Sequence, residues 1–499
     1  MVTQHTRAQH AQSITSRAQD YAQWYLDIIA AADLAEHGDV KGTMIIKPYG
    51  YAIWERMQHI LDDKIKETGH QNAYFPMFIP KSFLSREATH VEGFAKECAV
   101  VTHHRLMNNP NGEGVVVDPE SKLEEELVVR PTSETVIHAA FARWIKSWRD
   151  LPLLINQWAN VVRWEMRTRL FLRTSEFLWQ EGHTAHATEA DAEEEARKML
   201  DMYAWFAREV LAMEVIPGEK SESERFAGAL RTYTIEAMMQ DGKALQSGTS
   251  HNLGQNFAKA FEVKFLDQDN QQQYCWMTSW GVSTRLMGAL IMSHSDDKGL
   301  VLPPEIAPYQ VVVLPLWKKE EEKAAVMEQV SALREQLQHV GVRVHIDARD
   351  YETFGTKVYG WEKKGVPVRI EIGPRDLAQN QVMMARRDTG EKKSVAIDQV
   401  ASEISTVLEA MQKALFASSQ QRLQERTVTV DSYETFKTQI ETGGFFLALW
   451  CGSAECETRV KEETKATIRC IPFEKQQQNG KCMICNAATS EQVIFARAY

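Results

Sequence analysis

Hydrophobic positions along this chain recur with two different periods, and each period predicts one kind of element. In residues 21–34 and 51–68 the apolar side chains return every three or four positions, which indicates amphipathic helices, and Gly69 would end the second. Residues 161–166 and 177–183 are β-branched and aromatic with alternating polarity, so we expect two strands joined by a loop over 167–173. A strand over 72–78, ending near Pro76, should follow the second helix.

Beyond Pro303 and Pro304 the pattern changes to strands alternating with helices. Strands are predicted over 310–314, 342–346, 366–372 and 382–386, with an amphipathic helix over 320–338 that Gly341 closes. This order indicates a second unit, an α/β module with a mixed sheet.

Length and composition are those of a large globular enzyme. With 499 residues, 44% of them hydrophobic, the chain can bury substantial cores and should divide into two or three domains. No apolar run is long enough to span a bilayer. The first eighteen residues contain no acidic residue, as in a transit peptide, but such a segment is disfavoured because no secretory-type apolar stretch appears.

The net charge of −11 argues against indiscriminate nucleic-acid binding, which needs a broad basic surface. It leaves room for a nucleic-acid ligand bound by a local basic face. The pairs Arg386-Arg387 and Lys392-Lys393 could provide one, or could equally be the solvated end of a hairpin.

The segment 163–183 carries the strongest chemical signal. A two-residue period would place Arg163 and Glu165 on one sheet face, and Phe177, Trp179, Glu181 and His183 on one face of the returning strand. A guanidinium fork binds phosphate or carboxylate oxygens through two hydrogen bonds, which suggests the handling of a phosphate ester. From Arg163 and Glu165 alone, a surface ion pair would be the safer interpretation.

The wider segment, R-x-E followed by a basic loop and R-T-S-E-F-L-W-Q-E-G-H, resembles the ATP-binding second motif of class II aminoacyl-tRNA synthetases in its prolyl-specific form. Three further segments resemble the same family: Arg130–Glu134, its amino-acid-recognition loop; Gln246–Phe257, its nucleotide and proline sites; and Gly281–Ala289, its third motif. Taken singly, these segments could be a helix N-cap box, a loop, and a capped helix start.

The resemblance implies specific roles. Thr132 and Glu134 would accept hydrogen bonds from the ring nitrogen of proline, whose protonated form has two N–H donors and one positive charge. Arg163 and Arg285 would be catalytic, the first bridging the substrate carboxylate and the α-phosphate, the second holding the phosphate tail. For proline, the resemblance further implies Arg163, Trp179, His183, Phe226 and His251. For ATP, it further implies Arg163, Arg285, Glu165, Arg173, Gln246, Thr249 and Ser283.

Residues 361–376 resemble the anticodon-binding domain of the prolyl, threonyl, histidyl and glycyl enzymes. Unstacked anticodon bases are read by side-chain hydrogen bonds, for which Glu362, Arg369, Asp376 and Arg387 are the candidates. Charged residues at strand ends are also commonly only solvated. A departure at residues 354–357, where a proline-glycine turn is expected in relatives, leaves the local contacts open.

Five of the seven cysteines fall near the C-terminus. The pairs Cys451-x4-Cys456 and Cys482-x2-Cys485 could close a tetrahedral zinc site of four thiolates, structural because no position stays open for substrate. Reduced thiols without metal are the alternative. The arrangement also resembles the zinc-bearing C-terminal domain of archaeal/eukaryotic-type prolyl enzymes, in which a terminal tyrosine, here Tyr499, approaches the active site.

Together these features predict an α+β catalytic domain on an antiparallel sheet (residues 1–305), an α/β anticodon-binding domain (306–410) and a small α/β zinc-binding domain (411–499). The implied reaction joins L-proline, ATP and tRNA(Pro), with Mg²⁺ accompanying ATP. The resemblance further implies a cytoplasmic homodimer with Pro76 near the two-fold axis and no membrane association. No internal editing domain is expected, because roughly a hundred residues separate the second and third motifs.

Two alternatives remain open from the sequence. One is another synthetase of the same subgroup, although threonyl enzymes place a catalytic zinc in the active site and no comparable Cys/His set lies near Arg163. The other is a synthetase-like tRNA-binding or regulatory protein without catalytic activity. The presence of Arg163, Glu165 and Arg285 favours activity.

Overall fold

One eleven-stranded sheet runs through the computed structural model, which describes residues 14–85, 97–474 and 479–499. Its strands follow the order β22-β23-β27-β24-β11-β12-β13-β16-β10-β9-β3. The central part, from β11 to β9, is antiparallel, as predicted. These strands are β9 (Leu153–Val162), β10 (Glu176–His186), β11 (Val215–Glu219), β12 (Arg231–Met238), β13 (Ala244–Gly254) and β16 (Trp276–Ser283), with β3 (Gln71–Asn72) parallel at the edge.

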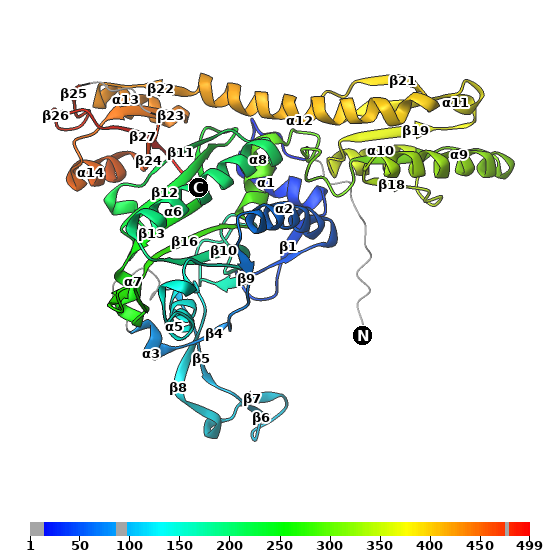
Figure 1. The fold of residues 1–499 in the computed structure, drawn as a ribbon. Helices are drawn as coiled ribbons and strands as arrows, with labels where there is room; N and C mark the ends of the chain where they lie inside the picture. Colours follow the sequence, from blue (N-terminus) through cyan, green and yellow to red (C-terminus); the bar gives the residue numbers. More distant parts are fainter. Residues whose placement is uncertain (1–13, 86–96, 475–478) are drawn as a thin grey trace.

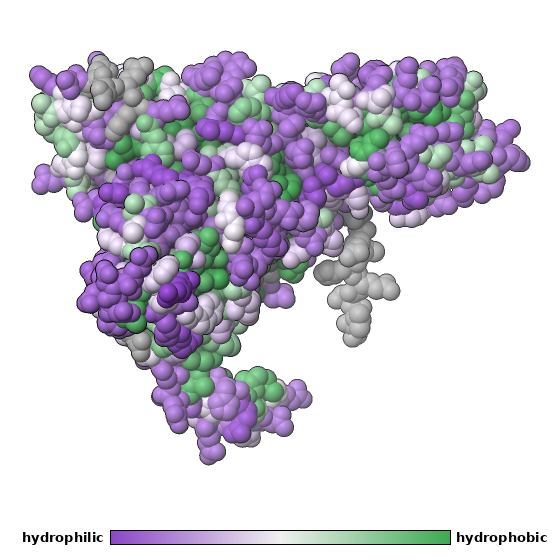
Figure 2. Space-filling view, in the orientation of Figure 1, coloured by the Kyte–Doolittle hydropathy of each residue, from purple (hydrophilic) through white to green (hydrophobic). Residues whose placement is uncertain are grey.

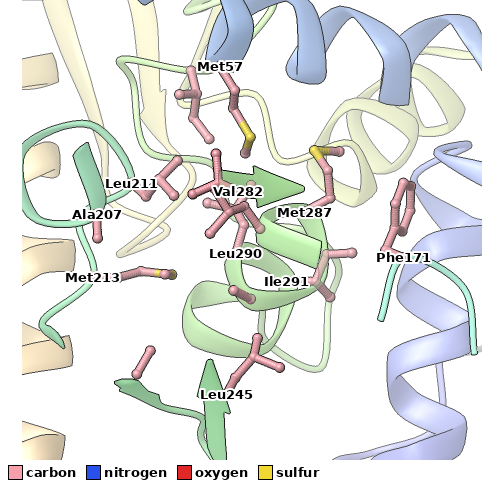
Figure 3. Close-up of a cluster of buried hydrophobic side chains, with 14 of the residues drawn as sticks. Met57, Phe171, Ala207, Leu211, Met213, Leu245, Val282, Met287, Leu290 and Ile291 are labelled. Atoms are coloured by element: carbon pink, nitrogen blue, oxygen red, sulfur yellow. The ribbon is translucent and has the colours of Figure 1, made fainter. Parts of the chain in front are cut away.

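Helices cover one face of this sheet through a large apolar core. Figure 3 shows part of it, where Met57, Val282, Met287 and Leu290 gather between a helix and a strand. The helices expected over 21–34 and 51–68 are confirmed, and the second begins earlier, at Pro48, because proline suits the first helical position. The covering helices are α1 (Tyr21–Ala31), α2 (Pro48–Glu67), α6 (Glu189–Trp205) and α8 (Arg285–His294).

Two strand predictions were wrong. The strand expected over 161–166 ends at Val162. Arg163 N–H still donates to Ser175 O next to β10, but Trp164 N–H donates to Glu97 O and Glu165 N–H to Arg163 O, so the pairing stops there. Arg163 and Glu165 therefore do not alternate along a strand. The strand expected over 72–78 is split, since β3 pairs with β9 while β4 (Phe78–Pro80) pairs with β8 in a different sheet.

An arm projects from the lower end of the catalytic part (Figure 1). It contains β4, β5 (Ala99–His103) and β8 (Lys122–Val129), with a hairpin of β6 (Leu106–Asn108) and β7 (Val115–Val117) at its tip. All three valines of β7 are exposed, and Figure 2 shows a hydrophobic patch on this arm. Shorter elements complete the catalytic part: β1 (Ala35–His37), β2 (Met44–Ile46), α3 (Lys81–Leu84), α5 (Glu134–Trp144), α7 (Asn256–Phe261), β14 (Lys264–Leu266) and β15 (Gln272–Tyr274).

A second, five-stranded sheet follows, with the mixed pairing that the sequence predicted. The strand order is β18-β17-β19-β20-β21, and the first three strands are parallel. The elements are β17 (Val311–Pro315), α9 (Glu320–His339), β18 (Val344–Ile346), α10 (Phe354–Lys363), β19 (Val368–Ile372), α11 (Pro374–Ala378), β20 (Gln381–Arg386) and β21 (Lys392–Ala396).

The long helix α12 (Val400–Glu425) leads from this sheet back to the C-terminal segment (Figure 1). The C-terminal strands join the catalytic sheet edge to edge, where β24 pairs with β11. Gly218 permits this approach, because a Cβ there would lie 2.6 Å from Ile471 O. The C-terminal elements are β22 (Thr427–Thr429), α13 (Tyr433–Gln439), β23 (Phe445–Leu449), α14 (Ala454–Thr464), β24 (Thr467–Pro472), β25 (Gly480–Lys481), β26 (Ala488–Thr489) and β27 (Gln492–Ala496).

The structure bears only in part on the expectations about a transit peptide and a membrane-spanning segment. The first thirteen residues, on which the question of a transit peptide mainly bears, lie outside the described residues. Among the helices of the described ranges, none combines the length and the apolar character that crossing a membrane requires.

Candidate active site

A cavity of about 240 Å³ lies against β10, β13 and β16 of the catalytic sheet. Most residues that the sequence singled out meet there, although they come from five separate stretches of chain. The predicted residues that line it are Thr132, Glu134, Arg163, Trp179, His183, Phe226, Gln246, Thr249, His251, Ser283 and Arg285. Two predicted ATP residues, Glu165 and Arg173, lie outside the lining, on the loop, where their charged groups are 3.7 Å apart.

The loop 130–134 presents buried oxygens to the cavity. Thr132 Oγ1 donates to Glu134 Oε2, and both side chains are nearly inaccessible to solvent. α5 begins at Glu134, and Ser133 makes no side-chain cap. Its hydroxyl instead donates to Glu181 Oε1 at 2.5 Å, so the T-S-E sequence serves the cavity and forms no capping box.

Glu181 organises one end of the cavity; the sequence placed it on the same strand face as Trp179 and His183 but indicated no specific role for it. Its Oε1 accepts from Gln157 Nε2 at 2.8 Å, and its Oε2 lies 2.9 Å from His183 Nε2. Burial lowers the pKa of His183, but the hydrogen bond and charge of Glu181 outweigh it, and the net shift is upward. The available signal was the alternation along β10, which places Glu181 between Trp179 and His183 on one face.

His251 forms the opposite wall with an uncharged ring. Burial lowers its pKa to about 4, so the imidazole is neutral at pH 7. Its Nδ1 lies 3.0 Å from Thr232 Oγ1, and the ring stacks on Phe226 with centroids 4.5 Å apart. A neutral, stacked imidazole offers an apolar face to a small ring.

Two arginines supply positive charge at fixed positions. Arg163 Nε donates to Pro131 O at 2.9 Å, and the guanidinium carbon lies 5.6 Å from the ring centroids of both Phe177 and Trp179. Arg285 stands at the first position of α8, where its N–H donates to Ser283 Oγ at 3.2 Å. Burial and the nearby Arg173 and Arg163 lower the pKa of Arg285 to about 10, so it remains cationic at neutral pH.

This cluster of cations suits a polyanion. Lys220 is one further member of the wall that was not predicted, because it follows β11 and has no periodic signal of its own. Its side chain is 2% exposed and lies 2.8 Å from Glu236.

The candidate anticodon residues divide into two groups. Glu362, Arg369 and Arg387 line a cavity of about 260 Å³ in the second sheet, and Asp376 lies outside its lining. The Asp376 carboxylate accepts from Gly373 N–H at 2.8 Å and so caps α11. Arg387 is buried and reaches into the catalytic part, where its two terminal nitrogens donate to Asp296 at 2.7 and 2.8 Å.

The four cysteines predicted to bind zinc lie together. Their sulfur atoms are all within 4.8 Å of one another, with Cys451 Sγ 3.7 Å from Cys456 Sγ and 3.6 Å from Cys485 Sγ. A tetrahedron with Zn–S bonds of ~2.3 Å has edges of about 3.8 Å. Donor set and spacing therefore fit a four-thiolate zinc site, with Cys482 as the remaining ligand.

Tyr499 lies outside the cavity lining and contacts Asp241, Ala244 and Arg169. Its hydroxyl donates to Asp241 Oδ2 at 2.5 Å, and its N–H donates to Ala244 O at 3.2 Å. The guanidinium carbon of Arg169, in the loop between Arg163 and Arg173, lies 5.6 Å from its ring. The C-terminus thus contacts the loop that the second motif predicted.

Comparison with known families places these observations in a class. Residues 117–294 match the family model described as "tRNA synthetase class II core domain (G, H, P, S and T)", and residues 310–406 match "Anticodon binding domain". The antiparallel sheet is that of a class II tRNA synthetase. Residues 433–499 match "Prolyl-tRNA synthetase, C-terminal".

Curated relatives narrow the class further. A protein of Porphyromonas gingivalis named "Proline--tRNA ligase" is 61% identical over 492 residues, covering 99% of this chain and all of the relative. Relatives of the same name from Bacteroides fragilis and Cytophaga hutchinsonii are 59% and 56% identical over 496 and 487 residues, covering 99% and 97% of this chain and 100% and 99% of theirs. The chain belongs to the proline-tRNA ligase family.

Proposed function

We propose that the protein activates L-proline with ATP to prolyl-adenylate and pyrophosphate, then transfers proline to the 3′ end of tRNA(Pro). The observation that carries this proposal is the single cavity that joins Thr132 and Glu134 to Arg163 and Arg285. It combines acceptors for a cationic ring nitrogen with two fixed guanidinium groups. The family match at 56–61% identity supports the same reaction.

Proline recognition would use both polar and apolar groups. Glu134 supplies the negative charge and Thr132 an oxygen, and these together match the two N–H donors of the protonated ring. Trp179, Phe226 and His251 would wall the ring, with His183 fixed by Glu181 at the inner end. Aromatic faces attract a cationic ring as well as excluding water.

The first chemical step would need little covalent participation by the protein. The proline carboxylate attacks the α-phosphorus of ATP, and pyrophosphate leaves with its electron pair. Arg163 would bridge the two reacting groups, and Arg285 would hold the phosphate tail, so catalysis comes from positioning and charge neutralisation. Mg²⁺ bound with ATP would further neutralise the phosphates.

The remaining nucleotide contacts come from both sides of the cavity. Gln246, Thr249 and Ser283 lie on its wall. Glu165 would accept from the adenine amino group and Arg173 would contact a phosphate, although both lie on the loop outside the lining.

For tRNA recognition we propose Glu362 and Arg369 as the groups that read anticodon bases, because both line the second cavity. Asp376 and Arg387 were candidates from the sequence. Their carboxylate and guanidinium are engaged by Gly373 and Asp296, which gives them structural tasks. Arg387 still lines the cavity and remains a secondary candidate.

We also propose a structural zinc ion on Cys451, Cys456, Cys482 and Cys485, domain boundaries near residues 305 and 410, and a cytoplasmic location. A homodimer is proposed as well, because apolar side chains flank Pro76: Tyr74 is 73% exposed and Phe78 44%. Sedimentation equilibrium tests the dimer. A mass of one chain, 56.9 kDa, at micromolar concentration would contradict it.

Editing is a separate proposal. The interval between the second and third motifs forms α6 and strands β11 to β13 of the catalytic sheet. A pocket of this size rejects smaller amino acids poorly, since one methylene is worth only about 1–3 kcal/mol. Because that interval is taken up by the catalytic part, we expect the chain not to hydrolyse alanyl-tRNA(Pro) efficiently. Rapid deacylation would contradict this expectation.

ATP-pyrophosphate exchange with each of the twenty amino acids tests the function. Exchange that depends on proline supports the proposal and leaves tRNA specificity to an aminoacylation assay. Exchange with another amino acid refutes the assignment of Thr132 and Glu134. Absence of exchange with every amino acid favours a tRNA-binding protein without catalytic activity.

A further inference from the structure

Lys220 is a buried cation of the active-site cavity to which the proposed reaction assigns no task. Its side chain lines the cavity and is 2% exposed. Its backbone N–H donates to Thr232 O on β12. Thr232 is in turn paired with His251 on β13. Lysine is almost never fully buried unless it is paired.

The ammonium group of Lys220 has one more donor than its protein partners use. It carries three N–H donors. In the described ranges, one is accepted by Glu236 Oε1 at 2.8 Å and one by the backbone oxygen of Arg469 at 2.7 Å. A third donor is thus available at the cavity wall.

The same cluster carries an excess positive charge. The carboxylate of Glu236 is inaccessible to solvent and also accepts from Arg469 Nε and Nη2 at 3.1 and 3.0 Å. Burial raises the pKa of Glu236, but Arg469 and Lys220 outweigh it and the net shift is downward. Within this cluster one carboxylate therefore pairs with two cations.

A purely structural task for Lys220 does not account for this arrangement. Arg469 alone meets Glu236 with two N–H bonds, and Thr234 Oγ1 adds a third at 2.9 Å. Burying a second cation beside a carboxylate that is already satisfied costs free energy unless an anion joins the site.

The position of the cluster points toward the nucleotide. Glu236 on β12 is paired with Gln246 on β13, one of the predicted ATP residues. The charges of Glu236 and Arg469 also affect the pKa of Arg285, after burial and the arginines Arg173 and Arg163. The cluster and the proposed phosphate-tail residue are therefore electrostatic neighbours.

We propose that Lys220 binds a phosphate group of a substrate and that the C-terminal segment positions it, through the Arg469 backbone oxygen and the Arg469–Glu236 ion pair. An ammonium group acts on phosphate as a compact point charge, which suits this site. The proposal rests on the proposed function. Two phosphates could reach the cavity, the tail of ATP and the backbone at the 3′ end of tRNA(Pro).

Kinetics of the full-length Lys220→Met variant test the proposal. If Lys220 holds the ATP tail, KM for ATP in pyrophosphate exchange rises roughly tenfold or more, as expected for one lost charge-assisted hydrogen bond. KM for proline and the unfolding temperature stay near wild type. If Lys220 holds tRNA, exchange is unchanged and KM for tRNA(Pro) in aminoacylation rises by a similar factor.

Lys461→Met is the matched control, since Lys461 is an exposed cation that lies 3.5 Å from Glu224, another residue of the cavity lining. It should leave both KM values within twofold, because exposed ion pairs contribute little. Lys220→Gln keeps a donor for Glu236 without the charge and replaces Lys220→Met if that variant does not fold.

Two results would overturn the proposal. One is unchanged KM for both ATP and tRNA(Pro). The other is an equal loss toward proline and ATP together with a lower unfolding temperature, which marks a structural residue. Failure of the proposed function is a separate outcome, because wild-type protein would then show no proline-dependent exchange at all.

Discussion

The ion pair between Arg387 and Asp296 should hold the anticodon-binding segment against the catalytic part. Arg387 has a side chain that is 4% exposed, and it donates to both carboxylate oxygens of Asp296 and, through Nε, to Glu362 O at 2.9 Å. Asp296 lies just beyond the end of α8, the helix that begins with Arg285. Arg387→Ala removes this bridge and leaves Asp296 partly buried without its cation.

The expected cost follows from these contacts. Charge-assisted hydrogen bonds contribute ~1.5–3 kcal/mol each. The Asp296 carboxylate is 33% exposed, so solvent screens part of the interaction, and we take about 2 kcal/mol for the pair. Leu300 N–H donates to Lys363 O at 3.0 Å across the same interface. Local opening made easier by about 2 kcal/mol should speed hydrogen exchange of that amide about thirtyfold.

Hydrogen-deuterium exchange followed by mass spectrometry on the peptide containing Leu300 measures this change. Arg386→Ala is the matched control, because Arg386 pairs at 2.7 Å with Asp388 inside its own hairpin. Exchange at Leu300 that stays at the wild-type rate in Arg387→Ala, together with a raised KM for tRNA(Pro), would refute the reasoning. Arg387 would then read the anticodon, as the sequence first suggested.

The pair also predicts a pH dependence. Burial raises the pKa of Asp296, but the hydrogen bonds and charge of Arg387 outweigh it, and the net shift is downward. The folded-state pKa therefore lies below the unfolded value of ~3.9. The bridge contributes fully above that value and is lost as the pH falls through the folded pKa. In the wild type, the hydrogen-exchange protection of the Leu300 amide should fall as the pH falls through this pKa. In Arg387→Ala this pH dependence should be absent.

Three further predictions concern the catalytic site and the C-terminus. Arg163→Lys should lower kcat/KM for ATP-pyrophosphate exchange by roughly a hundredfold, because the planar fork is lost while the charge remains. Arg167→Lys on the exposed loop is its control. A loss below threefold in Arg163→Lys would contradict the role assigned to Arg163. Deletion of Tyr499 should lower proline activation roughly tenfold, since Arg169 of the loop loses the ring beside it. Tyr499→Phe keeps the ring and should lower this activity less. Unchanged ATP-pyrophosphate exchange after the deletion would count against a role for the C-terminus. Elemental analysis should find one zinc per chain, lost in Cys482→Ser with a lower unfolding temperature but retained in Cys98→Ser; full metal content in Cys482→Ser would contradict the four-thiolate site.

Much of the architecture could be predicted from local pattern. The amphipathic helices at 48–67 and 320–339 and the mixed second sheet follow from periodicity and strand order, because burying one face of an element dictates its spacing. The antiparallel catalytic sheet was implied by the resemblance to class II synthetases. The pocket residues on β10 could be found from periodicity. Side chains two positions apart on a strand share a face, so Trp179, Glu181 and His183 were expected on the same face.

What the sequence determined by itself was the chemistry available: a carboxylate and hydroxyl for a cationic ring, arginines for phosphate, and four thiolates for a metal. The tertiary structure decided which of these groups meet. Arg469 and Glu236 are 233 positions apart, and only the β24–β11 edge brings them into contact, just as only domain packing brings Arg387 to Asp296. Contacts between distant segments depend on how whole elements pack, and no local period records that.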